Sequence, residues 1–198
     1  MGTFNLYSDG QPVIVDIGSG LYNAKTFSPY RYEILQMQSS YHNLPEINGV
    51  MQMNGAQYKS ANVSYKNENG VTVFSEDIAK AYPAAAGVSA WQRTFTFDRG
   101  AAAVTIADEA AFVGEKNHVD TMFIVPVQPV VEGNAVTIAV EGARPVTLTG
   151  EGVTFTVEEV DLSFDVNLEK HWNGKVWRVK AVADCGAAHK QTFTITQK

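Results

Sequence analysis

The stretch Gln92-Arg93-Thr94-Phe95-Thr96-Phe97-Asp98 decides the fold class, because aromatic side chains alternate strictly with threonines in it. Val153-Thr154-Phe155-Thr156-Val157 repeats the same alternation later in the chain. A period of two places the two kinds of side chain on opposite faces of an extended strand. Both stretches therefore predict β-strands with one face buried in a core.

Further segments with strand character follow one another along the whole sequence. They are residues 3–8, 12–16, 71–74, 103–107, 121–131, 136–140, 146–148, 176–182 and 191–196. Pairs rich in glycine or asparagine, which tolerate a positive φ, separate many of them, as in Asn69-Gly70, Arg99-Gly100 and Asn173-Gly174. Short turns join antiparallel neighbours, so we expect an all-β fold: an antiparallel, multi-stranded, supersandwich-like β-sandwich.

One segment departs from the strand pattern. Residues 75–83 are expected to form the single short helix, with Ser75 as N-cap, acidic residues in the first turn and Pro83 at its end. A helix of this length cannot cover a sheet.

Size and composition indicate one folded domain over residues 1–198. The chain has 198 residues, of which 45% are hydrophobic and 18% charged, and it contains no repeat, low-complexity tract or linker that would divide it. The formal net charge is -6 and no run of basic residues occurs, which argues against nucleic acid or anionic lipid as a partner. Cys185 is the only cysteine, so no internal disulfide can form, and we expect it to be a small buried hydrophobe.

The beginning of the chain is unusual. A strand pattern starts at Thr3, directly after Met1-Gly2, without a signal peptide or other lead-in residues. We expect a domain cut from a longer protein, with Met1 added at the boundary; an intact small protein that opens on an edge strand is the alternative. The sequence contains no stretch of about 18 consecutive apolar residues, so it predicts no membrane-spanning helix.

Polar and aromatic residues concentrate in residues 2–55, where two side chains are candidate metal ligands. Asp16 ends an apolar strand before Ile17-Gly18-Ser19-Gly20, a position where loops often present ligand-binding groups. His42 lies between Tyr41 and Asn43. Two ligands are one or two short of a zinc site, so a turn-capping aspartate and a structural histidine remain open alternatives.

The same segment resembles the opening of the C-terminal β-sandwich in the heparinase II/III-like polysaccharide lyases. The matching features, in order, are the Gly2-Thr3-Phe4-Asn5-Leu6-Tyr7 strand, the Pro12 to Gly18 turn with Asp16, and the His42-Asn43 pair. Trp91 to Thr94 and Asp98-Arg99-Gly100 fit the family's next hairpin, whereas beyond Phe112 only the strand pattern matches. The resemblance therefore covers about half of the 198 residues.

The resemblance implies a function that this chain performs only as part of a larger protein. In the family an N-terminal (α/α) toroid packs on the sandwich, and acidic polysaccharides that contain uronic acid, glycosaminoglycans among them, are cleaved by β-elimination in the cleft between the two. The toroid supplies most of the catalytic Asn, His and Tyr residues, so this chain alone is expected to be inactive, and the parent protein to be a periplasmic or secreted carbon–oxygen lyase.

The resemblance also implies site residues. Some members hold a structural metal, usually zinc, and Asp16 and His42 match two of its ligands, while a third would precede Gly2. We therefore expect no tightly bound metal in this chain. Arg31 can pair with a uronate carboxylate, and Tyr30, Tyr32, Tyr41 and Asn43 are the other candidate substrate-binding residues; an ordinary strand with a surface arginine is the alternative for residues 30–32.

The remaining functional patterns are weaker. His118, His171 and His189 have no spacing typical of a metal site or catalytic triad and are expected to be structural or surface residues. Trp172 and Trp177 could form a sugar platform with His171 and Arg178, although core packing is favoured. The alternative function for the chain is a noncatalytic carbohydrate-binding or structural sandwich module, which would expose several coplanar aromatic rings.

Overall fold

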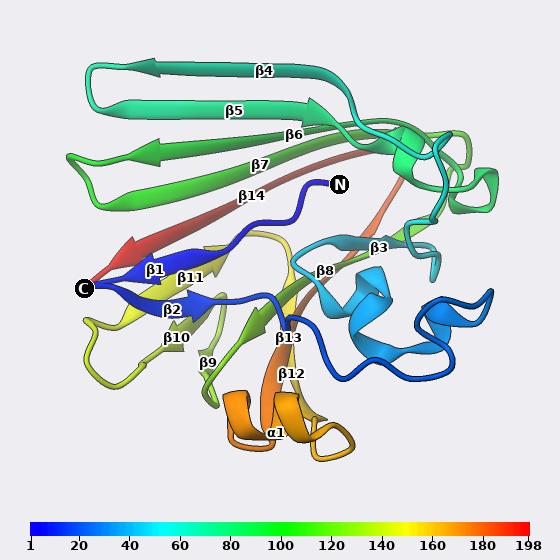
Figure 1. The fold of residues 1–198 in the computed structure, drawn as a ribbon. Helices are drawn as coiled ribbons and strands as arrows, with labels where there is room; N and C mark the ends of the chain where they lie inside the picture. Colours follow the sequence, from blue (N-terminus) through cyan, green and yellow to red (C-terminus); the bar gives the residue numbers. More distant parts are fainter.

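The computed structural model describes all residues 1–198 and confirms an all-β fold (Figure 1). Its larger sheet has eight antiparallel strands in the order β4-β5-β6-β7-β14-β11-β10-β9. These strands are β4 (Ala61–Glu68), β5 (Val71–Asp77), β6 (Val88–Asp98), β7 (Ala103–Phe112), β14 (Ala188–Gln197), β11 (Val146–Gly150), β10 (Ala135–Ile138) and β9 (Val130–Glu132). The stretch of residues 92–98 lies in β6 and pairs with β5 on one side and β7 on the other.

The smaller sheet has four antiparallel strands in the order β12-β13-β8-β3. They are β12 (Thr154–Asp161), β13 (Lys175–Cys185), β8 (Asn117–Val125) and β3 (Pro45–Ile47). The largest core cluster joins the two sheets, since it combines Phe123 and Val179 of the smaller sheet with Ile106 and Phe193 of the larger. The fold is therefore a sandwich whose core lies between the sheets.

A third, two-stranded unit closes one side of this core. It pairs β1 (Leu6–Ser8) with β2 (Gln11–Ile14). Val13 and Ile14 are fully buried in the main core, and the backbone N–H of Val15 donates to the carbonyl of Ile124 in β8 at 2.9 Å. This bond fixes the residues just before Asp16 against the smaller sheet.

The helix prediction for residues 75–83 was wrong. Ser75 to Asp77 continue β5, in register with Gln92 to Thr94 of β6, and only a 3-10 turn, η4 (Ala79–Ala81), follows. Asp77, rather than Ser75, accepts the N–H of Ala79 at 3.0 Å, and the Ser75 hydroxyl bonds to Thr94 across the strands.

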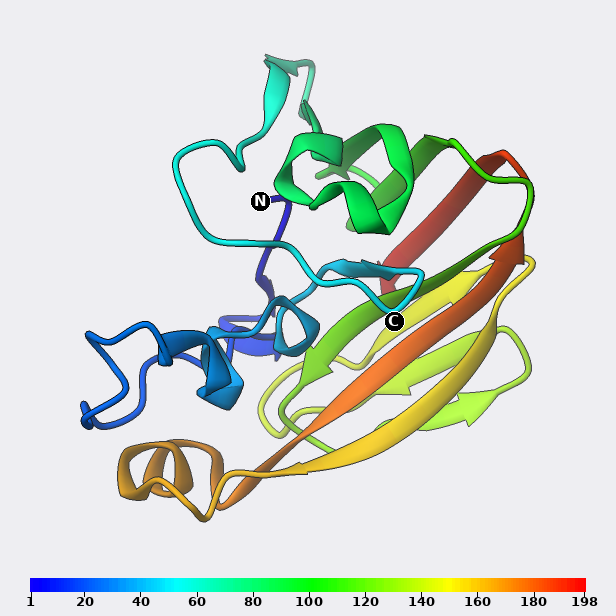
Figure 2. The ribbon, with the colours of Figure 1, turned by 90° about the vertical axis from the view of Figure 1, so that its right-hand side faces the viewer.

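The single α-helix is α1 (Val166–Trp172) near the C-terminus. The carboxylate of Asp165 caps it by accepting the N–H groups of Asn167 and Leu168, and Asn173 ends it in the left-handed conformation. Figure 2 shows α1 beyond the ends of β12 and β13, at the same end of the molecule as the blue segment of residues 20–40. None of the helices combines the length and the apolar character needed to cross a bilayer.

Other differences concern strands, and the short β3 is one that was not predicted. The predicted strand at residues 121–131 is two strands, β8 and β9, because Pro126 and Pro129 lie between them and lack the N–H that a ladder needs. β4 was not predicted; it forms the exposed edge of the larger sheet and projects with β5 beyond the core (Figure 1).

Candidate functional site

The fold brings Asp16 and His42 into direct contact. Asp16 follows β2, and His42 follows the 3-10 turn η3 (Ser39–Tyr41). Although 26 residues separate them, Oδ2 of Asp16 lies 2.6 Å from Nδ1 of His42. The other oxygen, Oδ1, accepts the backbone N–H of Gly18 at 2.9 Å. The hydrogen bond with His42 is the main reason why the pKa of Asp16 is lowered from its usual value.

The neighbouring Asn43 holds this region together from inside the protein. Its side chain is 1% exposed and donates to the carbonyls of Phe4 at 2.6 Å and Val15 at 3.0 Å. Its side-chain oxygen accepts the N–H of Ile124 at 2.7 Å. The amide thus joins the N-terminal strand, the end of β2 and β8. Asn43 is a structural residue here, and it does not reach a surface where it could bind substrate.

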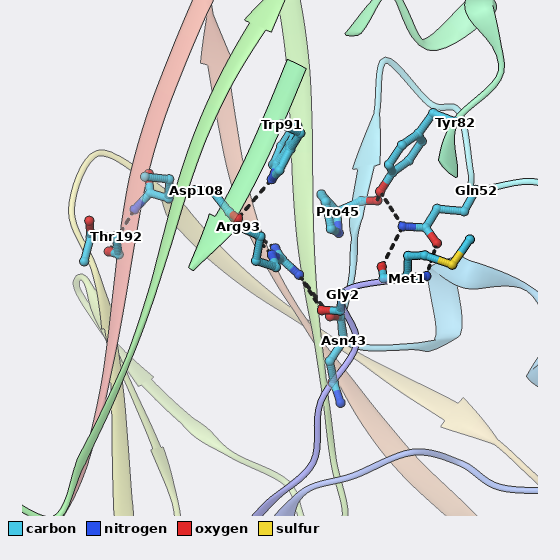
Figure 3. A network of polar contacts seen from close by, with 11 residues as sticks. Met1, Gly2, Asn43, Pro45, Gln52, Tyr82, Trp91, Arg93, Asp108 and Thr192 are labelled. Carbon is cyan, nitrogen blue, oxygen red and sulfur yellow. Dashed lines mark hydrogen bonds and ion pairs between the residues drawn. The ribbon is translucent and has the colours of Figure 1, made fainter. Parts of the chain in front are cut away.

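A buried arginine network supports the same region (Figure 3). Arg93 donates through Nε and Nη2 to the two oxygens of Asp108 at 2.8 and 2.7 Å, and the indole of Trp91 donates to Asp108 at 2.9 Å. Nη1 of Arg93 reaches the carbonyls of Gly2 at 3.2 Å and Asn43 at 3.3 Å. Burial opposes the charged form of Arg93, but the adjacent Asp108 carboxylate outweighs it, so that the pKa of Arg93 is raised.

Asp16 and His42 face an open hollow of about 290 Å³, which we call the His42 hollow. Tyr32, Met37, Gln52 and Met53 also line it. The amino group of Met1 lies at the same place and donates to Oε1 of Gln52 at 2.6 Å (Figure 3). A polypeptide joined to this end of the chain would therefore enter beside Asp16 and His42.

Only some of the other predicted site residues lie at the His42 hollow. Tyr32 lines the His42 hollow, and Arg31 is exposed next to it, with Nη2 3.8 Å from the sulfur of Met37 and no carboxylate partner. Tyr30 is exposed but does not line this hollow. Tyr41 is half-buried and packs under the guanidinium of Arg178, which lies 4.5 Å from its ring centre. Arg31 and Tyr32 therefore remain candidates, and Tyr41 has a packing role.

The residues present do not make a zinc site by themselves. Carboxylate oxygen and imidazole nitrogen suit zinc, but no group of three or more His, Cys, Asp or Glu side chains converges anywhere in the structure. A tetrahedral zinc would also hold the two donor atoms about 3.3 Å apart, wider than their 2.6 Å hydrogen bond.

Gln52 and His171 also contribute to this region. Gln52 has no motif that marks it, yet it bonds to the amino group and carbonyl of Met1. His171 was expected to be a structural or surface residue, and it is exposed, but it lies in a second hollow that Asp16 also lines. Its position at the C-terminal end of α1 could have been found from Asp165 and the Asn173-Gly174 pair, which delimit that helix.

Comparison with known proteins does not assign the chain to a family. No model of a protein family matches it, and a search of curated proteins found no match. A relationship to heparinase II/III-like lyases is therefore proposed from the sequence resemblance alone.

Proposed function

We propose that this chain is the β-sandwich domain of a heparinase II/III-like polysaccharide lyase, and that it helps to form the cleft in which uronic-acid-containing polysaccharide undergoes β-elimination. The observation that supports this is the contact between Asp16 and His42, at 2.6 Å, on the rim of the His42 hollow. These are the two residues that match the family's metal ligands. In this proposal an (α/α) toroid joined at the N-terminal end covers the hollow, and the parent protein is periplasmic or secreted.

The chemistry assigned to the complete cleft has three requirements. The uronate carboxylate must be neutralised, a base must remove the C5 proton, and an acid must protonate the leaving O4. Arg31 is the residue of this chain suited to the first task, because its guanidinium has no carboxylate partner and lies beside the hollow. Tyr32 can contact the sugar from the rim. The base and the acid come from the toroid.

Zinc in the parent protein would be structural. It would take Asp16 and His42 as two of its ligands and so hold the loop that follows β2 against the 39–43 segment. In this chain the shared hydrogen bond and the Gly18 N–H hold Asp16 in place.

The alternative of a noncatalytic sugar-binding module has less support. The most exposed aromatic side chains of the chain are Phe27 and Tyr22, and their rings meet edge to face at 78° with centroids 5.3 Å apart. A flat platform for a sugar ring needs parallel, coplanar rings instead.

The experiment is a comparison of this chain with the same chain preceded by the segment encoded upstream of it. Each is incubated with uronic acid polymers, and the ultraviolet absorbance of the unsaturated uronate product is followed. We expect turnover only with the longer protein. His42→Ala in the longer protein should abolish this turnover, whereas Lys190→Ala, on the solvent-facing side of the larger sheet, should not. Turnover by this chain alone, or an upstream stop codon, would contradict the proposal.

A further inference from the structure

A second hollow lies on the other side of Asp16. It has a volume of about 130 Å³, and its polar lining consists of Asn5, Tyr7, Asp16 and His171, with Trp172 beside them. We call it the His171 hollow. Because Asp16 lines both hollows, they are adjacent, and a chain-like ligand bound at His42 would continue past Asp16 toward α1.

Two hydrogen bonds hold α1 against the loop that follows Asp16. At the C-terminal end of the helix, the indole N–H of Trp172 donates to the carbonyl of Ile17 at 2.8 Å. At its N-terminal end, Oδ2 of Asp165 accepts the N–H of Leu21 at 2.6 Å. His171 packs edge to face on Trp172, with ring centroids 4.6 Å apart. The imidazole therefore has a fixed place relative to Asp16; Figure 2 shows its helix, α1, at the lower left.

Three side chains in the His171 hollow are free to bind a ligand. The amide of Asn5, the phenol of Tyr7 and the imidazole of His171 all line it, and none of them takes part in any of the protein's side-chain hydrogen bonds or salt bridges. Tyr7 is 62% exposed, so its ring is also available to the apolar face of a sugar. Hydroxyl-rich rings are recognised by this combination of donors, acceptors and an aromatic surface.

We propose that Asn5, Tyr7 and His171 form a second saccharide subsite, which binds the sugar residue that follows a disaccharide unit at His42. This inference rests on the proposed function, because it takes the ligand to be an acidic polysaccharide. The small volume of the hollow fits a single ring rather than a longer segment. The subsite would make binding depend on the length of the oligosaccharide, since a disaccharide can occupy the His42 hollow without reaching α1.

The test uses the chain itself, labelled with ¹⁵N, and disaccharides and tetrasaccharides of hyaluronan, heparosan and alginate. We expect at least one tetrasaccharide to shift the amide signals of both hollows. The double variant Asn5→Ala/His171→Ala should weaken tetrasaccharide binding about fivefold or more, the loss expected for one or two hydrogen bonds, and leave disaccharide binding unchanged. His118→Ala is the matched control, because this exposed histidine lies at the opposite end of the smaller sheet from α1.

The outcomes separate the two proposals. Tetrasaccharide shifts confined to the His42 hollow, or equal affinity of the double variant and the wild type, would overturn the second subsite and leave the proposed function standing. If no oligosaccharide perturbs either hollow, the second subsite is overturned, whereas the proposed function is decided by the turnover experiment on the longer protein. The spectra of the free variants, which should retain the dispersion of the wild type, verify that the fold is intact.

Discussion

Replacing Arg93 by methionine should be among the most destabilising single changes in this protein. The guanidinium is 1% exposed and Asp108 is fully buried, so Arg93→Met leaves a carboxylate in the interior without its counter-charge. Removal of one partner from such a pair costs about 3–5 kcal/mol. The variant also loses the bonds to the carbonyls of Gly2 and Asn43, which adds to the cost. Since whole domains are stable by about 5–15 kcal/mol, this is a large share of the total.

The measurement is urea unfolding of the wild type and variants at neutral pH, followed by tryptophan fluorescence. Glu109→Gln is the matched control: it is the next residue in β7 but faces the other way, and its ion pair with Lys190 at 3.1 Å is exposed, so we expect a loss below about 1 kcal/mol. The double variant Arg93→Met/Asp108→Leu should be more stable than Arg93→Met, because it buries no unpaired charge. A loss for Arg93→Met no greater than that for Glu109→Gln would refute the reasoning.

Three further predictions concern the histidines and the metal. Zinc added to this chain should bind weakly through Asp16 and His42, and His42→Ala should abolish the binding in isothermal titration; tight, stoichiometric zinc would show that a further ligand exists within residues 1–198. The hydrogen bond with Asp184 raises the pKa of His118. Protonated His118 should therefore stabilise the fold below about pH 6.5, the ordinary histidine value. This stabilisation should be lost as the pH rises through the raised pKa. In urea unfolding at pH 5.5, His118→Gln should therefore be less stable than the wild type, by less than about 1 kcal/mol because the His118 side chain is partly exposed. A difference in unfolding free energy that grows toward pH 8.5 would contradict the assignment. Burial lowers the pKa of His189, and its Nε2 is buried without a partner, so stability should fall as the pH drops below the unfolded value of about 6.5. His189→Phe should remove that loss, and an unchanged acid dependence would argue against it.

The fold class could be predicted because alternation is a local property. Residues 92–98 and 153–157 show it, and β6 and β12 occur there as expected, although Phe97 and Val157 are 41% and 37% exposed. β4 was missed although Val63 and Tyr65 alternate with polar residues, because its apolar pattern is short and both side chains remain exposed at the edge of the sheet. Ser75 was a plausible N-cap in isolation, but pairing between β5 and β6 recruited it into the sheet. Local signals failed where a neighbouring strand, distant in sequence, competed for the same backbone.

The site could be predicted as a set of candidate residues but not as a geometry. Nothing in the spacing of Asp16 and His42 requires their contact, which depends on hydrogen bonds between distant segments. Asn43 reaches Phe4 and Ile124, 39 and 81 residues away, and Arg93 reaches Gly2, 91 residues away. Such bonds leave no periodic trace in the sequence, and neither do the contacts of Gln52.

The division of roles within Tyr41-His42-Asn43 follows from the backbone. His42 has φ of −124° and ψ of 172°, an extended conformation in which successive side chains point to opposite sides. When His42 faces the hollow, Asn43 must therefore turn inward, where it binds three backbone groups. Tyr41 ends the 3-10 turn η3 and packs against Arg178. In an extended segment, the residue directly next to a site residue points away from the site, so it is less suited to a site role. A loss of activity on Asn43→Ala would accordingly report disruption of the fold around His42, and only variants on the outward side, such as Tyr32→Phe and Arg31→Gln, can report on substrate contact.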